Sequence, residues 1–114
     1  MHESSIISYT LKSVEKAALQ NNITYVDEIV LVIGKLRAAL PAALQKVFHI
    51  LRGNGMFSNT SLIIKETDIV AVCLECGVYS QLDLMNCDMC PACKSRKLKL
   101  LQGNELIIEN FKGR

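Results

Sequence analysis

The chain carries Cys73-Leu74-Glu75-Cys76 and Cys90-Pro91-Ala92-Cys93, two C-x-x-C pairs separated by thirteen residues. Two residues between paired cysteines let one tight turn point both sulfurs at one ion, and two such turns supply the four thiolates of a tetrahedral zinc site. Four sulfur ligands leave no open position for water, so the expected site is structural rather than catalytic. The alternatives for this spacing are a redox dithiol and an iron–sulfur centre.

A fifth cysteine makes the second pair ambiguous. All five cysteines lie between positions 73 and 93, and an odd number in paired spacings is a poor disulfide framework but a good metal site in a reducing compartment. Cys87 and Cys90 also form a C-x-x-C, but we favour Cys90 with Cys93 because Pro91 stiffens that turn. Cys87 is then a free thiol near the site or an alternate ligand.

Hydrophobic patterning outside the cysteines predicts an α+β fold. Apolar residues at helical spacing indicate a helix from about Ser4 to Asn21, with Ser4 or Ser5 as its cap. The run Ile29–Ile33 reads as a buried strand, and Pro41 begins a second helix that Gly53 ends. Further strands are expected over 61–72 and, on either side of a bend at Gln102-Gly103-Asn104, over 98–111. The apolar stripe of the second helix is Leu44, Val47, Phe48 and Leu51.

We therefore expect two helices packed on a small, about three-stranded sheet, with a zinc-ribbon module inserted between two strands. The last strand is too apolar to hang free, so it should return to the first sheet. This gives an α+β domain of residues 1–70 plus 101–114 and a zinc-ribbon domain of residues 71–100.

Composition excludes several classes of function. The net charge is only +2, with seven Lys/Arg against six Asp/Glu in residues 1–72 and six against five in residues 73–114. A basic cluster follows the second cysteine pair, but acidic residues offset it and only Tyr79 is available there to stack on bases, so we expect no nucleic-acid partner. No apolar run reaches the length of a membrane span and no signal peptide is evident, so we expect a cytoplasmic protein with no membrane partner. The cluster is Lys94, Arg96, Lys97 and Lys99; the offsetting acids are Glu75, Asp83 and Asp88.

The N-terminus, Met1-His2-Glu3, offers a second metal site. The Met1 amine, the His2 amide, the Glu3 amide and the His2 ring can place four nitrogens in one plane around a metal once both amides deprotonate. Square-planar nitrogen ligation suits Ni(II) or Cu(II), and spacing alone does not choose between them. The alternative is a disordered terminus with a solvated histidine.

The remaining polar residues point to no catalytic site. His49, with Gln45 on the polar side of the second helix, reads as solvated, as do Glu66 and Asp68 on the outward face of a strand. There is no nucleophile–base pair, no Gly-rich phosphate loop and no catalytically spaced carboxylate pair, so we expect no enzyme.

Together these motifs resemble the HypA/HybF family of hydrogenase and urease nickel-incorporation metallochaperones, nearly end to end. The resemblance lies in Met1-His2-Glu3, Ile33-Gly34, the two C-x-x-C pairs with Gly77 and Pro91, and Gln102-Gly103-Asn104-Glu105-Leu106. Two departures are Cys87 and Lys94, which stands where the family often has glycine.

The resemblance implies that His2 and the nearby backbone bind Ni2+ as cargo, and that Cys73, Cys76, Cys90 and Cys93 bind structural Zn2+. It implies delivery of nickel to a hydrogenase large-subunit precursor or to urease maturation proteins, together with a GTPase partner of the same pathway. The client enzyme stays open, as does the choice between monomer and homodimer. One rival interpretation is a zinc-ribbon adaptor that binds protein or nucleic acid without nickel; another is a redox enzyme using the cysteines.

Overall fold

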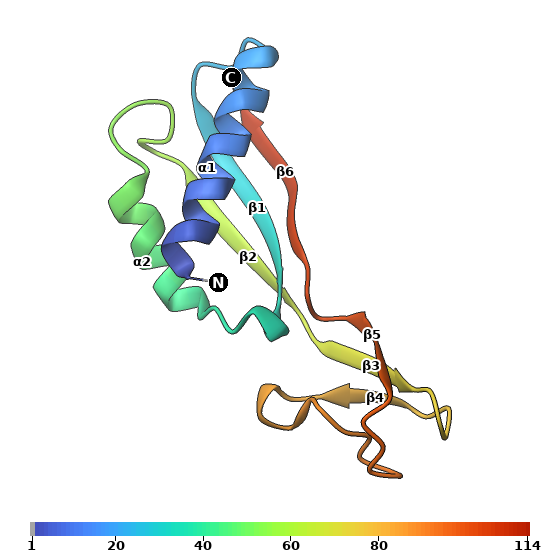
Figure 1. The fold of residues 1–114 in the computed structure, drawn as a ribbon. Helices are drawn as coiled ribbons and strands as arrows, with labels where there is room; N and C mark the ends of the chain where they lie inside the picture. Colours follow the sequence, from blue (N-terminus) through green and yellow to red (C-terminus); the bar gives the residue numbers. More distant parts are fainter. Residues whose placement is uncertain (1) are drawn as a thin grey trace. The chain divides into compact units, whose positions relative to one another are not determined.

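The computed structural model describes residues 2–114 and has an α+β fold, as predicted (Figure 1). It forms two compact units: unit 1 (Met1–Val32, Ala39–Lys65 and Ile107–Arg114) and unit 2 (Ile33–Ala38 and Glu66–Leu106). The elements are, in order, α1 (Glu3–Gln20), β1 (Val26–Gly34), the 3-10 turn η1 (Lys35–Arg37), α2 (Pro41–Leu51), β2 (Ser61–Thr67), β3 (Ile69–Cys73), β4 (Tyr79–Leu82), the 3-10 turn η2 (Leu84–Asn86), β5 (Leu98–Gln102) and β6 (Leu106–Gly113).

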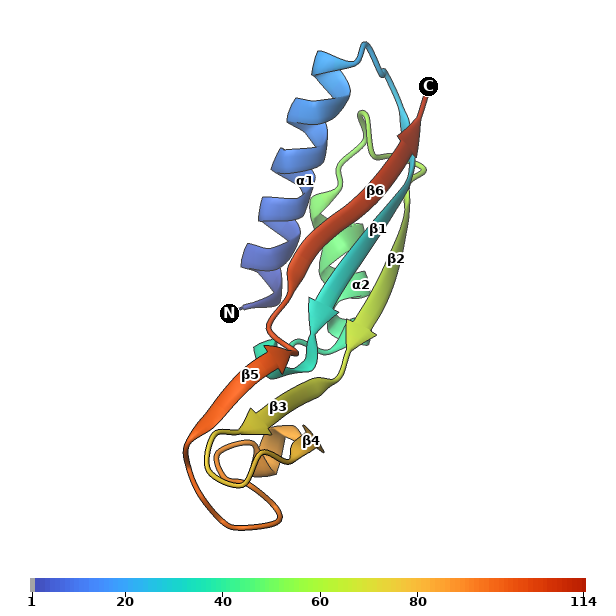
Figure 2. The same cartoon turned by 90° about the vertical axis from the view of Figure 1, so that its right-hand side faces the viewer.

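Unit 1 is a three-stranded sheet in the order β2-β1-β6, with both helices on one face (Figure 2). The last strand, β6, returns to this first sheet, as its apolar sequence predicted. Full burial of an aliphatic or aromatic side chain stabilises the fold by about 1.5–3 kcal/mol, so the layer of side chains between helices and sheet holds unit 1 together. That layer includes Ile7 and Val14 of α1, Ile29 and Leu31 of β1, and Leu44 and Phe48 of α2, all at most 1% exposed.

The predicted cap of α1 is wrong. His2, not Ser4 or Ser5, occupies the N-cap position, and its carbonyl accepts hydrogen bonds from the amides of Ser5 and Ile6 (3.1 and 3.2 Å) without any side-chain cap. Apolar spacing alone does not fix a helix start, and burial of Ile6 and Ile7 extends the helix through both serines. The helix ends at Gln20, with Asn21 as its C-cap, close to the predicted end at Asn21.

The strand predicted over 61–72 is two strands in two different sheets. β2 belongs to unit 1, β3 belongs to unit 2, and Asp68 separates them. The prediction that Asp68 is merely solvated is also wrong, because its carboxylate accepts a 2.6 Å hydrogen bond from Lys35 Nζ. This pairing raises the pKa of Lys35, first through the hydrogen bond and then through the opposite charge. In α2, Leu51 was expected in the apolar stripe but is exposed.

Unit 2 is built on a second antiparallel sheet in the order β4-β3-β5. Ala71 faces Ser80 on β4 and Leu100 on β5, and the alternate residues of β3 (Ile69, Ala71 and Cys73) are buried. The last residue of this buried row is therefore also the first cysteine of the metal motif, so packing fixes where that sulfur lies.

Two segments of unit 2, one at Gly34 and one at Gly103, approach each other closely. The amide of Gly34 donates to the Glu105 carbonyl (2.8 Å) and that of Leu36 donates to the Gly103 carbonyl (2.9 Å). A Cβ on Gly34 would lie 2.0 Å from the Gly103 carbonyl oxygen, so only glycine permits this approach. No helix among residues 2–114 has the length and apolar character needed to span a bilayer.

Candidate metal sites

The two cysteine pairs form two turns of the same local structure. In the first, the Cys76 amide donates to Cys73 Sγ (3.4 Å) and the Gly77 amide to the Cys73 carbonyl (2.9 Å). In the second, the Cys93 amide donates to Cys90 Sγ (3.5 Å) and the Lys94 amide to the Cys90 carbonyl (2.9 Å). Each turn thus presents a buried first sulfur and an exposed second one.

The four sulfurs meet at one point. The Sγ atoms of Cys73, Cys76, Cys90 and Cys93 all lie within 4.8 Å of one another. Cys73 Sγ is 3.6 Å from Cys93 Sγ, and Cys76 Sγ is 3.6 Å from Cys90 Sγ. Four sulfurs at about 2.3 Å from a tetrahedral zinc ion lie about 3.8 Å apart. The cluster therefore fits a structural zinc site with little movement.

Electrostatics prepare the first sulfur of each turn for ligation. The backbone amide of Cys76, and then that of Glu75 with neighbouring thiols, lowers the pKa of Cys73 from 9.0 to about 6. The amide of Cys93 lowers the pKa of Cys90 in the same way. The Ser95 amide alone would lower the pKa of Cys93, but the Cys73 thiol, burial and the other two thiols together raise it to about 12. Because a thiolate is the zinc ligand, the buried sulfurs are the ones that ionise first.

Lys94 occupies a backbone conformation that suits glycine. Its φ is 65°, in the left-handed region, and Gly77 has φ 76° at the matching place in the first turn. The left-handed φ lets the amide after each pair reach back to the carbonyl of the first cysteine. Lys94 is therefore a strained residue in a turn of the same form as the first one.

Cys87 lies outside the four-sulfur cluster. Its Sγ donates to the Leu84 carbonyl at 3.5 Å, and η2 beside it is capped by Asp83, whose carboxylate accepts the amides of Met85 and Asn86. The second C-x-x-C formed with Cys90 is therefore not the one gathered at the cluster.

The basic cluster after the second turn is partly neutralised within unit 2. Lys97 Nζ lies 3.5 Å from a Glu75 carboxylate oxygen, and Arg96 Nη1 lies 4.0 Å from an Asp88 oxygen. These pairs spread opposite charges along the module, which is the balance that argued against a nucleic-acid surface.

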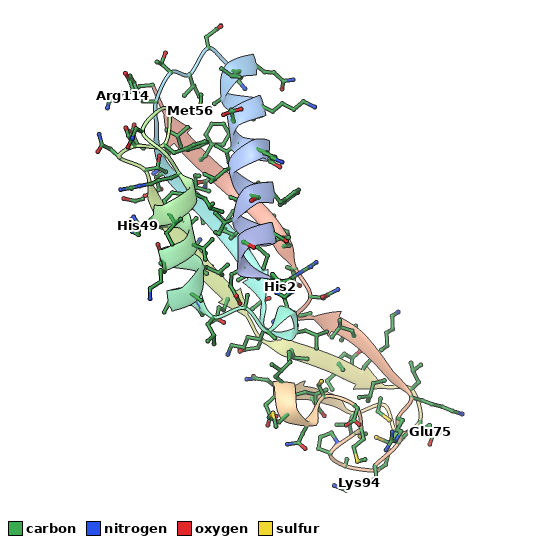
Figure 3. The ribbon with its side chains drawn as sticks, turned by 60° about the vertical axis from the view of Figure 1, so that its left-hand side comes forward. His2, His49, Met56, Glu75, Lys94 and Arg114 are labelled. Atoms are coloured by element: carbon green, nitrogen blue, oxygen red, sulfur yellow. The ribbon has the colours of Figure 1, made fainter. Side chains whose placement is uncertain are left out.

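The N-terminal motif lies at the start of α1, where Figure 3 shows His2 at the helix end. The His2 side chain is exposed and its backbone is extended, with φ −77° and ψ 147°. The amide of Glu3 is among the first N–H groups of a helix, which have no intrahelical acceptor. Met1, also predicted as a ligand, lies outside the described residues.

The fold and these sites together define an α+β protein that carries a zinc-ribbon site. A protein-family profile described as hydrogenase/urease nickel incorporation, metallochaperone, HypA matches residues 1–113. The chain belongs to this HypA family of nickel metallochaperones of hydrogenase maturation.

Individual proteins of this family are similar to the chain over nearly its whole length. The hydrogenase maturation factor HypA of Moorella thermoacetica is 28% identical over 113 residues, covering 99% of both chains. That of Campylobacter jejuni is 32% identical over 107 residues, covering 93% of each. The solution structure of the Ni metallochaperone HypA from Helicobacter pylori shares the fold, with a TM-score of 0.69 at 22% identity over 99% of this chain and 97% of that one.

Proposed function

We propose that this chain binds Ni(II) at its N-terminus and passes it to a metalloenzyme precursor. The His2 ring anchors the ion, and the Met1 amine with the amides of His2 and Glu3 completes a planar nitrogen set. The recipient is a hydrogenase large-subunit precursor, with urease maturation proteins as the alternative client, and a GTPase of the same pathway assists. The protein is a carrier and not an enzyme, acts in the cytoplasm, and works as a monomer or homodimer.

The observation that carries this proposal is the placement of the N-cap. Because α1 begins at Glu3 and its first described hydrogen bonds come from the amides of Ser5 and Ile6, the Glu3 amide is free to lose its proton to a metal. Had a serine capped the helix, as the sequence suggested, the start would lie further from His2. The position of His2 as the N-cap of α1 also reduces the ordering entropy that chelation costs.

Charge supports nitrogen ligation at this helix end. The N-terminus of a helix carries a partial positive charge, which disfavours a bare divalent cation. Loss of two amide protons offsets the two charges of Ni(II), and the Glu3 carboxylate adds a negative charge in the first turn. Because binding then releases protons, nickel is held more weakly at low pH, which favours release in an acidified assay.

We assign the second metal a structural role. In this proposal residues 71–100, which lie within unit 2, serve as the zinc-ribbon domain, and residues 1–70 plus 101–114 serve as the nickel-binding domain. Cys73, Cys76, Cys90 and Cys93 hold Zn2+, whose closed sulfur shell leaves no position for substrate. The matching turns and the 3.6 Å sulfur separations support this assignment.

The test is calorimetry with Ni(II) on zinc-loaded wild type, His2→Ala and His49→Ala. His49 is the other histidine of the chain and is exposed, so His49→Ala is a matched control for loss of one imidazole. We expect His2→Ala to abolish tight nickel binding and His49→Ala to leave it unchanged. Equal nickel binding by all three proteins would instead favour the zinc-ribbon adaptor.

The coordination geometry of bound nickel gives a second test of the proposed ligands, independent of the affinity. A planar nitrogen set makes Ni(II) diamagnetic with a visible absorption band, whereas six-coordinate nickel is paramagnetic. Acetylating the terminal amine should remove the planar spectrum while leaving zinc in place. A spectrum unchanged by acetylation would exclude the Met1 amine as a ligand.

A further inference from the structure

A polar pocket lies between α2 and β2, in unit 1. Its volume is about 430 Å³, and we call it the α2 pocket. It is lined by Gln45, His49 and Arg52 on one side and by Ser58, Asn59, Thr60, Ser61 and Leu62 on the other. None of these residues takes part in either metal site.

The α2 side of the pocket is held in place by hydrogen bonds to the chain opposite. Gln45, His49 and Arg52 follow one another at helical spacing, so they share one face of α2 and its C-cap. Gln45 Nε2 donates to the Leu62 carbonyl (2.6 Å), and Arg52 Nη1 donates to the Thr60 carbonyl (3.2 Å). The guanidinium is therefore oriented toward the pocket rather than extended into solvent.

On the opposite wall the Thr60 side chain is held in place, and on α2 the His49 ring has a packing partner. Thr60 is 2% exposed and its hydroxyl donates to the Val26 carbonyl of β1 (2.5 Å). The His49 ring packs edge-on against Phe48, with centroids 5.9 Å apart, and Figure 3 shows it on the side of α2 away from α1. Gln45, Arg52 and Thr60 are thus held in place without any ligand, which lowers the entropic cost of binding one.

Several hydrogen-bond donors of the pocket remain available. A guanidinium has five N–H groups, and one of those on Arg52 is used by Thr60. Within residues 2–114, no hydrogen bond is made by the hydroxyls of Ser58 and Ser61 or by the side-chain amide of Asn59. The pocket therefore combines one cation, one imidazole and three neutral polar groups.

No acidic residue lines the pocket. Within unit 1, residues 39–65 contain Lys46, Arg52 and Lys65 and no Asp or Glu. Three carboxylates of unit 1 are paired with cations elsewhere, and within residues 2–114 no carboxylate lies within 4 Å of a charged nitrogen of Lys46 or Arg52. Those three pairs are Asp27 with Arg114, Glu28 with Lys112, and Glu109 with Lys65.

Basic residues in the last turn of a helix also have an ordinary role, because they offset the negative end of the helix dipole. That role accounts for a charge at His49 or Arg52. It does not account for the hydroxyl and amide groups that a separate segment adds to the lining, nor for the absence of any acid among the lining residues.

We propose that the α2 pocket binds an oxyanion, the phosphate or carboxylate group of a ligand, with Arg52 as its anchor. The planar fork of Arg52 matches two oxygens of such a group, and His49, Ser58 and Ser61 supply further donors. This site is separate from nickel binding and would let the protein respond to a phosphorylated or acidic ligand while carrying metal.

The experiment is a titration of the full-length, zinc-loaded protein with inorganic phosphate at constant ionic strength, followed by amide and imidazole NMR shifts. We expect saturable shifts confined to the residues that line the pocket, which are Gln45, His49, Arg52 and residues 58–62. Arg52→Gln should weaken binding by about tenfold or more, because it removes a charge-assisted bidentate contact. Arg52→Lys should give an intermediate loss, since it keeps the charge but not the fork.

Lys12→Gln is the matched control, because Lys12 is an exposed cation on α1 outside the pocket. It should bind phosphate like wild type. Linear, non-saturable shifts, or an equal effect of Lys12→Gln and Arg52→Gln, would overturn the proposal and leave the helix-dipole role. If Arg52→Gln loses thermal stability, the test uses Ser58→Ala instead, which removes a donor that makes no described hydrogen bond. Ser58→Ala should then bind phosphate more weakly than wild type, and unchanged binding would overturn the proposal.

Acetate as a second probe distinguishes the source of the oxyanion. Tighter binding of phosphate indicates a phosphorylated ligand, and comparable binding of acetate indicates a carboxylate. Nickel affinity should be unchanged in Arg52→Gln, so this proposal and the nickel proposal fail independently.

Discussion

Exchanging the residues after the two cysteine pairs should shift zinc affinity in opposite directions. Gly77 and Lys94 both have left-handed backbones, with φ 76° and φ 65°. A residue with a Cβ pays about 1–2 kcal/mol in this conformation. Glycine gives back about 0.4–1 kcal/mol through the freedom of its unfolded chain. The difference is about 1 kcal/mol, disfavouring Gly77→Ala and favouring Lys94→Gly.

The structure excludes a competing steric effect at the first position. Nothing lies within 4 Å of a Cβ built on Gly77, so Gly77→Ala reports backbone strain alone. Since metal binding requires the folded turn, the strain appears in zinc affinity, and about 1 kcal/mol is about a fivefold change. Lys94→Ala removes the charge but retains the strain, so it should match wild type.

Competition with a chromogenic zinc chelator measures these affinities. We expect Gly77→Ala to release zinc more readily and Lys94→Gly to hold it more tightly than wild type. A Lys94→Gly protein that holds zinc no better than Lys94→Ala would refute the argument, because the gain would then not come from the backbone.

Three further outcomes are expected. Gly34→Ala should prevent native folding, because its Cβ would meet the Gly103 carbonyl oxygen at 2.0 Å, whereas Gly55→Ala, with open space around its Cβ, should fold; urea unfolding with far-UV circular dichroism separates them. The hydroxyl of Thr67, with the amides of Glu105 and Gly103, lowers the pKa of Glu105 below 4.5. The ionised Glu105 carboxylate should therefore stabilise the fold at neutral pH, and this stabilisation should be lost as the pH falls through the lowered pKa. The difference in unfolding free energy between wild type and Glu105→Gln should accordingly shrink in acid. Chelating the zinc should remove amide-exchange protection from residues 73–97 while the α1 amides stay protected, and equal loss in both would contradict a local structural role.

Local sequence patterns predicted the structure correctly where one physical effect dominates. The C-x-x-C spacing predicted four converging sulfurs because turn geometry fixes where both sulfurs point. The run Ile29–Ile33 predicted β1 because a short β-branched stretch buried on both sides has few alternatives. The apolar spacing of α1 predicted a helix, and the return of β6 followed from its apolar sequence.

Features that depend on distant partners were missed. The break at Asp68 follows from pairing β2 and β3 with different sheets and from Lys35, 33 residues away. The close approach of Gly34 and Gly103 joins segments that are more than twice as far apart in sequence. His49 is exposed, as predicted, but the pocket beside it was not predicted, because its other wall comes from residues 58–62.

The order of strands has a consequence for synthesis on the ribosome. The sheet of unit 1 places β1 in the middle, yet its third strand, β6, is translated only after the entire cysteine module. Until β6 emerges, one edge of β1 has no partner and its backbone groups are open to aggregation. β3 pairs directly with β5, and β5 comes just before β6 in the chain. If the nascent cysteine module bound zinc early, β5 would already lie beside β3 when β6 emerged. The loop that β6 must close to reach β1 would then be shorter. The zinc supply would then set the rate at which β6 covers the open edge of β1 in the nascent chain.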